Sequence, residues 1–258
     1  MAKCLLFVFG SRSCGGQNKE KGMMKKPIYR FLPGLLLLVA VWAMSACTER
    51  IETPSAGDGY LDLEFLQAET RAVISPDGSG SFSDGDRVGL FIDNGSAVQY
   101  RELTCQGGVW TPRLKRSEFG TGRLTLSAHY PVQTGSPQSA GQYTYVLPTD
   151  QSNETTLSSA DILFARVELP EGSYRAQLPF EHLFHRLQVE LSPAGNGAAV
   201  SVRSISSGTL NLLTGEVTVT GTQYRWITPY TQSDGSFTAL VLPQSAEPYR
   251  SGEGLLKL

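Results

Sequence analysis

Apolar and polar residues alternate along much of the chain from Tyr60 onward. In residues 60–65, Leu or Phe stands at every second position, and Asp62 and Glu64 lie between them. A two-residue period of this kind predicts a strand with one buried face. Similar short runs, separated by polar and Gly- or Pro-containing loops, predict further strands at 87–92, 99–103, 108–110, 123–130, 143–146, 162–169, 178–191, 198–205, 208–212, 216–220 and 237–242.

No segment keeps a helical period over eleven or more residues. Many short strands with turn signals between them, such as Asp93-Asn94-Gly95, are typical of a β-sandwich. The pattern therefore predicts an all-β fold.

A different pattern occupies residues 24–46. This stretch opens with basic residues, continues with the apolar run 35–42, and closes with Ser45 and Ala46 directly before Cys47. A basic segment, a short apolar segment and small residues at the end make up a secretory signal peptide. The apolar run is shorter than the roughly 20 residues that a membrane-spanning helix needs.

The last four residues of this pattern, Met-Ser-Ala-Cys at 44–47, resemble the lipobox of bacterial lipoproteins. That resemblance implies cleavage between Ala46 and Cys47 and acylation of Cys47, for example with palmitate. Stable anchoring takes two or more acyl chains. Residues 1–23 lie upstream of the signal and are expected to be non-structural, and the polar residues 47–59 are expected to tether the body to the membrane.

Removing residues 1–46 takes away seven of the 22 Lys and Arg residues and one of the 24 acidic residues, which leaves 15 basic and 23 acidic residues and a net charge of −8. An acidic exported body argues against nucleic acid or anionic lipid as a partner. Cys105 is then the one cysteine besides Cys47, so neither an intrachain disulfide nor a cysteine metal cluster is expected.

Two stretches are candidate metal sites. His182 and His185 would share one face of a helix, but their surroundings read as strand, where they point to opposite faces. The acidic loop from Asp77 to Asp86 lacks the Gly and Glu of an EF-hand, because Phe82 and Val88 stand at those positions. A solvated turn is the favoured interpretation, with a looser calcium site as the alternative. We predict no metal site and no cofactor.

Catalytic signatures are equally weak. The three histidines are His129, His182 and His185, no Gly-x-Ser-x-Gly elbow is present, and Cys105 has no recognisable partner motif. The chain is therefore not predicted to be an enzyme. A carbohydrate-binding surface lipoprotein is the alternative function, since exposed aromatic residues could stack on sugars, although such residues more often belong to a core; the candidates are Trp110, Tyr143, Tyr145, Trp226 and Tyr230.

A series of phrases between residues 60 and 244, in order behind the lipobox, resembles the fimbrillin family, whose lipoprotein-derived members build fimbriae of anaerobic Gram-negative bacteria. In one-letter code the phrases are TRA at 70–72, FSDGDRVGLF at 82–91, WTP at 110–112, AHYP at 128–131, DILFA at 161–165, LPFEHLFHRL at 178–187 and LVLPQ at 240–244.

The resemblance implies two transthyretin-like β-sandwich domains in series, at 60–177 and 178–258. The second would be short and incomplete. It also implies a lipid-anchored protein of the outer membrane surface and a role in a fimbrium that mediates adhesion. Its partners would be other fimbrial subunits, together with host or bacterial surface ligands.

Assembly in the fimbrillin family involves an Arg-specific cut after an early strand, after which a strand of the next subunit fills the groove. Such β-augmentation uses main-chain hydrogen bonds for affinity and alternate side chains for register. Here the strand at 60–66 would be the removable one, and Arg71 the candidate cleavage residue. Arg50 is a second candidate, but a cut there would release the lipid without the strand.

Overall fold

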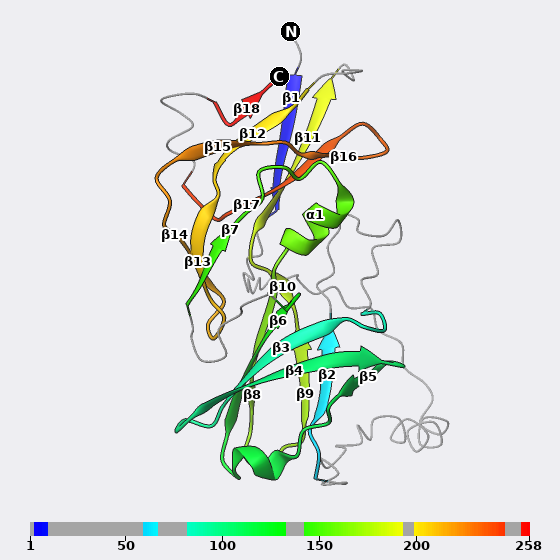
Figure 1. Ribbon diagram of the computed structural model, residues 1–258, viewed down its shortest axis with the longest axis vertical. Helices are drawn as coiled ribbons and strands as arrows, with labels where there is room; N and C mark the ends of the chain where they lie inside the picture. The colour runs from blue at the N-terminus through cyan, green and yellow to red at the C-terminus, as the bar shows by residue number, and fades with distance from the viewer. Residues whose placement is uncertain (1–2, 10–58, 67–81, 133–141, 193–198, 246–253) are drawn as a thin grey trace, which may run out of the picture. The chain divides into compact units, whose positions relative to one another are not determined.

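The computed structural model describes residues 3–9, 59–66, 82–132, 142–192, 199–245 and 254–258. In these residues the chain is mostly β-strand, with one short α-helix and one 3-10 turn (Figure 1). The predicted all-β fold is therefore confirmed. Neither helical segment has the length and apolar character that a membrane crossing requires.

The largest sheet has six strands in the order β10-β8-β6-β3-β4-β5. One of its faces packs with the two-stranded sheet β2-β9 around a first hydrophobic core. The 3-10 turn η1, Arg116–Phe119, adds Phe119 to this core. The strand bounds are β2 Asp62–Leu66, β3 Arg87–Asp93, β4 Val98–Gln106, β5 Val109–Thr111, β6 Leu124–Tyr130, β8 Leu163–Leu169, β9 Arg175–Pro179 and β10 Glu181–His182.

Three smaller sheets and the helix α1, Glu154–Ala160, carry the second core and a small satellite cluster around Phe237. The sheets are ordered β1-β11-β17-β16, β14-β13-β7 and β15-β12-β18. Their strands are β1 Lys3–Phe9, β7 Tyr143–Val146, β11 His185–Ser192, β12 Ser201–Ile205, β13 Ser207–Asn211, β14 Glu216–Val219, β15 Tyr224–Ile227, β16 Tyr230–Thr231, β17 Phe237–Val241 and β18 Leu256–Lys257.

The two cores do not follow the order of the chain. Tyr145 in β7 and Ile162 belong to the second core, although β8, which begins directly after Ile162, returns to the first. Strand β3 contributes to both, because Leu90 and Phe91 point to opposite faces of the sheet. The division of the chain into domains at residue 177 stays a prediction.

One predicted strand was wrong in its extent. The stretch 178–191 is divided into the end of β9, the short β10 and β11, with a bend at 183–184 between the last two. Here the chain leaves the first core at Phe180 and enters the second at Phe184. Apolar residues recur on both sides of the bend and are buried in both halves, so the sequence pattern showed no sign of this crossing.

The sequence pattern also missed α1 and the strands β1, β15, β16 and β18. The helix has seven residues, too few to show a helical period, and is marked only by its N-cap, where Asn153 Oδ1 accepts a hydrogen bond from Thr156 N at 2.8 Å. Strand β15 does not show a regular alternation of buried and exposed positions, because the neighbouring residues Arg225 and Trp226 are both exposed.

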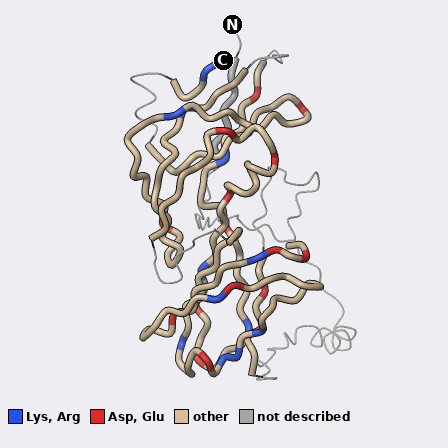
Figure 2. The backbone as a smooth tube through the Cα atoms, viewed as in Figure 1, with Lys and Arg blue, Asp and Glu red and all other residues tan. Residues whose placement is uncertain are grey.

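Basic and acidic residues are interspersed along the described strands (Figure 2). Several form exposed cross-strand pairs, such as Arg87 with Glu102 and Arg123 with Glu168. Exposed pairs of this kind contribute little to stability, about 0–1 kcal/mol each.

Candidate functional site at strand β2

Strand β2 inserts one face into the first core. Leu61, just before the strand, and Phe65 within it are 5% and 6% exposed, and Leu63 packs at the edge of the same core. Asp62 and Glu64 point outward, as the two-residue period predicts. The rings of Phe65 and Trp110 meet edge to face, with 4.8 Å between their centroids.

Backbone hydrogen bonds join β2 to β9 in parallel, with Asp62 opposite Arg175 and Leu66 opposite Pro179. Beyond the strand ends, Asp62 N donates to Tyr174 O, and Phe180 N donates to Leu66 O, each at 2.8 Å. The two strands lie 111 to 113 residues apart in sequence at their side-chain contacts, so this pairing is long-range.

Polar side chains reinforce this pair on its exposed face. Gln177 Nε2 donates to Glu64 Oε2 at 2.8 Å, and Arg175 pairs with the same carboxylate at 3.4 Å. The hydrogen bond from Gln177, together with Arg175, lowers the pKa of Glu64.

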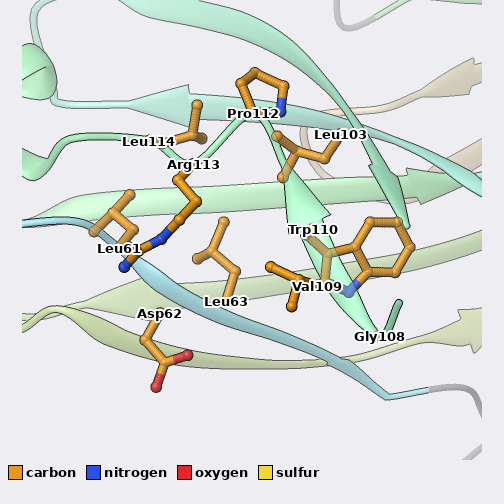
Figure 3. Close-up of a pocket in the computed structure, with 10 residues that line it drawn as sticks. All are labelled: Leu61, Asp62, Leu63, Leu103, Gly108, Val109, Trp110, Pro112, Arg113 and Leu114. Atoms are coloured by element: carbon orange, nitrogen blue, oxygen red, sulfur yellow. The ribbon is translucent and has the colours of Figure 1, made fainter. Parts of the chain in front are cut away.

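On the side away from β9, the residues just before β2 pair with the segment that follows β5. Leu61 N donates to Leu114 O at 2.8 Å and Arg116 N donates to Gly59 O at 2.9 Å. A hollow of about 220 Å³ lies between β2 and residues 108–114 (Figure 3). It is lined mainly by apolar residues of both segments, including Leu61, Leu63, Trp110 and Leu114. Among the described residues, β2 is therefore hydrogen-bonded along its edge with β9, and the other side is bonded at the residues that lead into the strand.

The residues predicted for lipidation and processing, Ala46, Cys47, Arg50 and Arg71, lie outside the described residues. Their assignments stay predictions. The acidic loop is described only from Phe82 onward. There Asp84 Oδ1 accepts from Gly107 N at 2.7 Å, and Asp86 accepts from Ser83 N at 2.7 Å and from Tyr130 Oη at 2.9 Å.

The histidines of the LPFEHLFHRL phrase are not on one continuous strand, because His182 ends β10 and His185 begins β11. His182 Nδ1 lies 2.9 Å from Asp161 Oδ1, and Arg186 Nη2 donates to Asp161 Oδ2 at 2.7 Å. Burial raises the pKa of Asp161, but the hydrogen bond from His182 and the charges of both partners outweigh it and hold the pKa below its ordinary value. Asp161 is 3% exposed, so this is a buried ion cluster between the ends of α1, β10 and β11. Within the described part of the chain, no three His, Cys, Asp or Glu side chains gather as a metal site.

His129 lies in β6 and is completely buried. Its ring stacks near Phe91 and Tyr100, and among the described residues neither ring nitrogen has a hydrogen-bond partner. Burial lowers the pKa of His129 to about 4. Cys105 is likewise buried, in β4. Both side chains lie within the protein rather than facing an open cleft.

Acid is expected to destabilise the protein through His129. Its pKa rises from about 4 when folded to about 6.5 when unfolded, so the stability is full above pH 6.5 and falls as the pH drops towards 4. The loss amounts to about 2 kcal/mol at pH 5 relative to pH 7.5. Urea unfolding of the wild type and of His129→Leu at both pH values measures it.

The His129→Leu variant should lose this part of the pH dependence. It should keep a smaller slope of stability against pH from His185, because burial also lowers the pKa of His185. An unchanged slope in His129→Leu would show that His129 is not buried in its neutral form.

The aromatic residues considered as a sugar platform are mostly packed inside. Trp110 packs against the first core, and Tyr143 and Tyr230 pack against the second. Tyr145 is 7% exposed, and its hydroxyl donates to Ala160 O at 2.9 Å. Trp226 is 38% exposed, in β15. These contacts favour a role in the cores for four of the five residues.

Phrases that are distant in the sequence meet in the structure. Gly89 is the register partner of His129 across β3 and β6, and Tyr130 Oη bonds to Asp86 at the end of the same sheet. The Asp161 cluster joins the DILFA phrase to the LPFEHLFHRL phrase in the same way. The model of the fimbrillin-like family matches residues 70–252 of this chain. The chain belongs to the fimbrillin-like family.

Solved structures that match the chain include proteins from Bacteroides. A candidate cell adhesion protein of Bacteroides uniformis ATCC 8492 is 22% identical to the fimbrillin-like chain, with a TM-score of 0.51, and the match covers 73% of this chain and 77% of that one. A candidate cell adhesion protein of Bacteroides thetaiotaomicron VPI-5482 is 19% identical, with a TM-score of 0.48 and coverages of 72% and 76%. A fimbrial protein of Bacteroides ovatus ATCC 8483 is 16% identical, with a TM-score of 0.42 and coverages of 72% and 42%. No curated protein matches the chain.

Proposed function

We propose that this fimbrillin-like protein is a structural or anchoring subunit of a cell-surface fimbrium that serves adhesion, and that it assembles by β-strand addition. In this proposal the precursor is cut before Cys47, the lipidated Cys47 holds it at the outer membrane, and two transthyretin-like sandwiches form the body. Family membership supports the fimbrial and adhesive role, and the two hydrophobic cores are compatible with two sandwiches.

The observation that supports the assembly mechanism is the position of β2, which pairs with β9 and places side chains in the first core. A cut after Arg71 would remove a strand that contributes Leu61 and Phe65 to the first core. Its loss would expose core side chains and the backbone edge of β9, which β2 covers. An edge exposed in this way invites pairing with another strand. A strand of a neighbouring subunit with apolar residues at alternate positions would restore both the hydrogen bonds and the core.

The test is the N-terminus and intact mass of the protein recovered from the cell surface and from purified fimbriae. We expect a free Ala72 N-terminus in fimbriae, because the cut after Arg71 separates the anchor and β2 from the body. Arg71→Lys should remove the site of an Arg-specific protease and leave the chain lipidated at Cys47. Arg50→Lys is the matched control and should still yield the Ala72 start. Intact lipidated chains as the main form in purified fimbriae would overturn the cleavage.

A further inference from the structure

We infer that the outward face of the sheet β15-β12-β18 binds an acidic saccharide, that is, a sugar chain whose rings carry carboxylate groups. The inference rests on the proposed adhesive function and names the class of ligand that the adhesion would recognise. It concerns a face of the second core's smallest sheets and not strand β2.

The two faces of this sheet differ in burial. Val202 and Ser204 of β12 and Ile227 of β15 are completely buried, and Val202 and Ile227 belong to the second core. Successive side chains of a strand point to opposite faces. Arg203 therefore lies on the other face, where it is partly exposed. This other face is the outward one.

Cross-strand pairing brings aromatic and basic side chains together on the outward face. Trp226 of β15 lies directly opposite Arg203 of β12, and directly opposite residues of an antiparallel pair share a face. Lys257 of β18 lies opposite Ser201 and extends this face on the other side of β12. The guanidinium carbon of Arg203 lies 4.6 Å from the ring centroid of Tyr224, two residues before Trp226. The face is thus aromatic and cationic.

The aromatic part of this face is accessible. Trp226 is 38% exposed, whereas Trp110 packs against the first core. Within the described part of the chain, neither Trp226 nor Tyr224 belongs to a hydrophobic cluster. An exposed indole presents a flat apolar ring, and the C–H face of a sugar ring is a surface that packs on it.

The charge of the sheet selects an anionic sugar. Its three strands contain Arg203, Arg225 and Lys257 and neither Asp nor Glu, although the chain from Cys47 onward has a net charge of −8. The planar guanidinium of Arg203 can bind a carboxylate through two parallel hydrogen bonds. The acidic body would repel a dense polyanion such as nucleic acid. A sugar with one carboxylate per ring, such as a uronic acid, therefore fits best.

Binding of tetragalacturonate to the full chain tests the inference. Isothermal titration calorimetry compares the acid with its methyl ester, which keeps the sugar rings and lacks their charges. The acid should bind at least tenfold more tightly. Arg203→Gln and Trp226→Ala should each weaken binding of the acid at least fivefold, because the first removes the carboxylate donor and the second the stacking ring.

Arg225→Gln is the matched control. Arg225 has the same charge in the same strand, but it lies opposite the buried Ser204 and so belongs to the other face. Its replacement should change the affinity less than twofold. Trp226→Tyr keeps an aromatic ring and should bind within threefold of the wild type, and an unchanged urea midpoint confirms the fold of each variant.

Three results would overturn the inference. The first is equal binding of the acid and its ester, or no binding of either at millimolar concentration. The second is an equal effect of Arg203→Gln and Arg225→Gln. The third is equally tight binding of tetraglutamate, which would identify an acidic peptide as the partner.

This inference and the proposed assembly fail separately. A lipidated Cys47 start in fimbriae would overturn cleavage after Arg71 and leave saccharide binding by the full chain unaffected. Absent saccharide binding together with an Ala72 start would overturn the saccharide site alone.

Discussion

Replacing Asp161 by Asn is expected to lower the free energy of unfolding by about 4 kcal/mol, because the change leaves a buried cation without its counter-charge. Arg186 is 9% exposed, and its Nη2 donates to Asp161. Its Nε atom has no hydrogen-bond partner among the described residues. The carboxylate of Asp161 is therefore the group that offsets the cost of burying the guanidinium charge. Urea unfolding at pH 7.5 measures the loss.

Asp150→Asn is the matched control, because Asp150 is exposed and its side chain bonds to nearby Ser152 within the described part of the chain. Its effect should stay within about 0.5 kcal/mol. The double variant Asp161→Leu with Arg186→Met should recover much of the loss, since apolar residues often replace a buried ion pair without cost. A loss below about 1 kcal/mol in Asp161→Asn would show that the cluster is not buried.

Gly89→Ala is expected to destabilise the protein by about 3 kcal/mol, the upper end of the usual range for overpacking. A Cβ atom at Gly89 would overlap Cε1 of His129 and would lie 2.5 Å from its Nε2 and 2.7 Å from Oη of Tyr100. His129 is completely buried, so its ring cannot move into solvent to make room. The strand β3, held between β4 and β6, has little freedom to shift. Urea unfolding measures the change.

Gly122→Ala provides the control, because no atom lies within 4 Å of a Cβ built there and its φ is not positive. That change should be neutral or slightly stabilising. His129→Ala removes the obstructing ring. The double variant with Gly89→Ala should therefore lose at least about 1 kcal/mol less unfolding free energy than the two single variants lose in total. Strict additivity would show that the two positions do not contact each other.

The period of two in residues 60–65 was enough to predict β2 and its buried face, because local alternation reports directly which side of a strand faces a core. It did not indicate the partner of β2. The parallel pair with β9 joins segments more than 100 residues apart, and no local pattern carries that information. The hollow beside β5 depends on the same long-range arrangement.

Polar residues inside the protein show the same limit. Gln151 is completely buried, and its side chain bonds both Leu240 N, at 2.8 Å, and Leu240 O, at 3.1 Å. In the sequence it is one polar residue in a polar loop. The partner that makes its burial favourable comes from β17, 89 residues away.

The sequence by itself determined the strand-rich class, the signal and lipobox pattern, and the fimbrillin resemblance, since each depends on residue type at short spacing. Only the tertiary structure decided that Gly89 faces His129, that Asp161 neutralises Arg186, and that the stretch 178–191 crosses between two cores. It also decided that β11 pairs with β1 on one edge and with β17 on the other. These features arise when distant segments pack together, because burial turns a lone polar side chain or an open backbone edge into one that requires a partner.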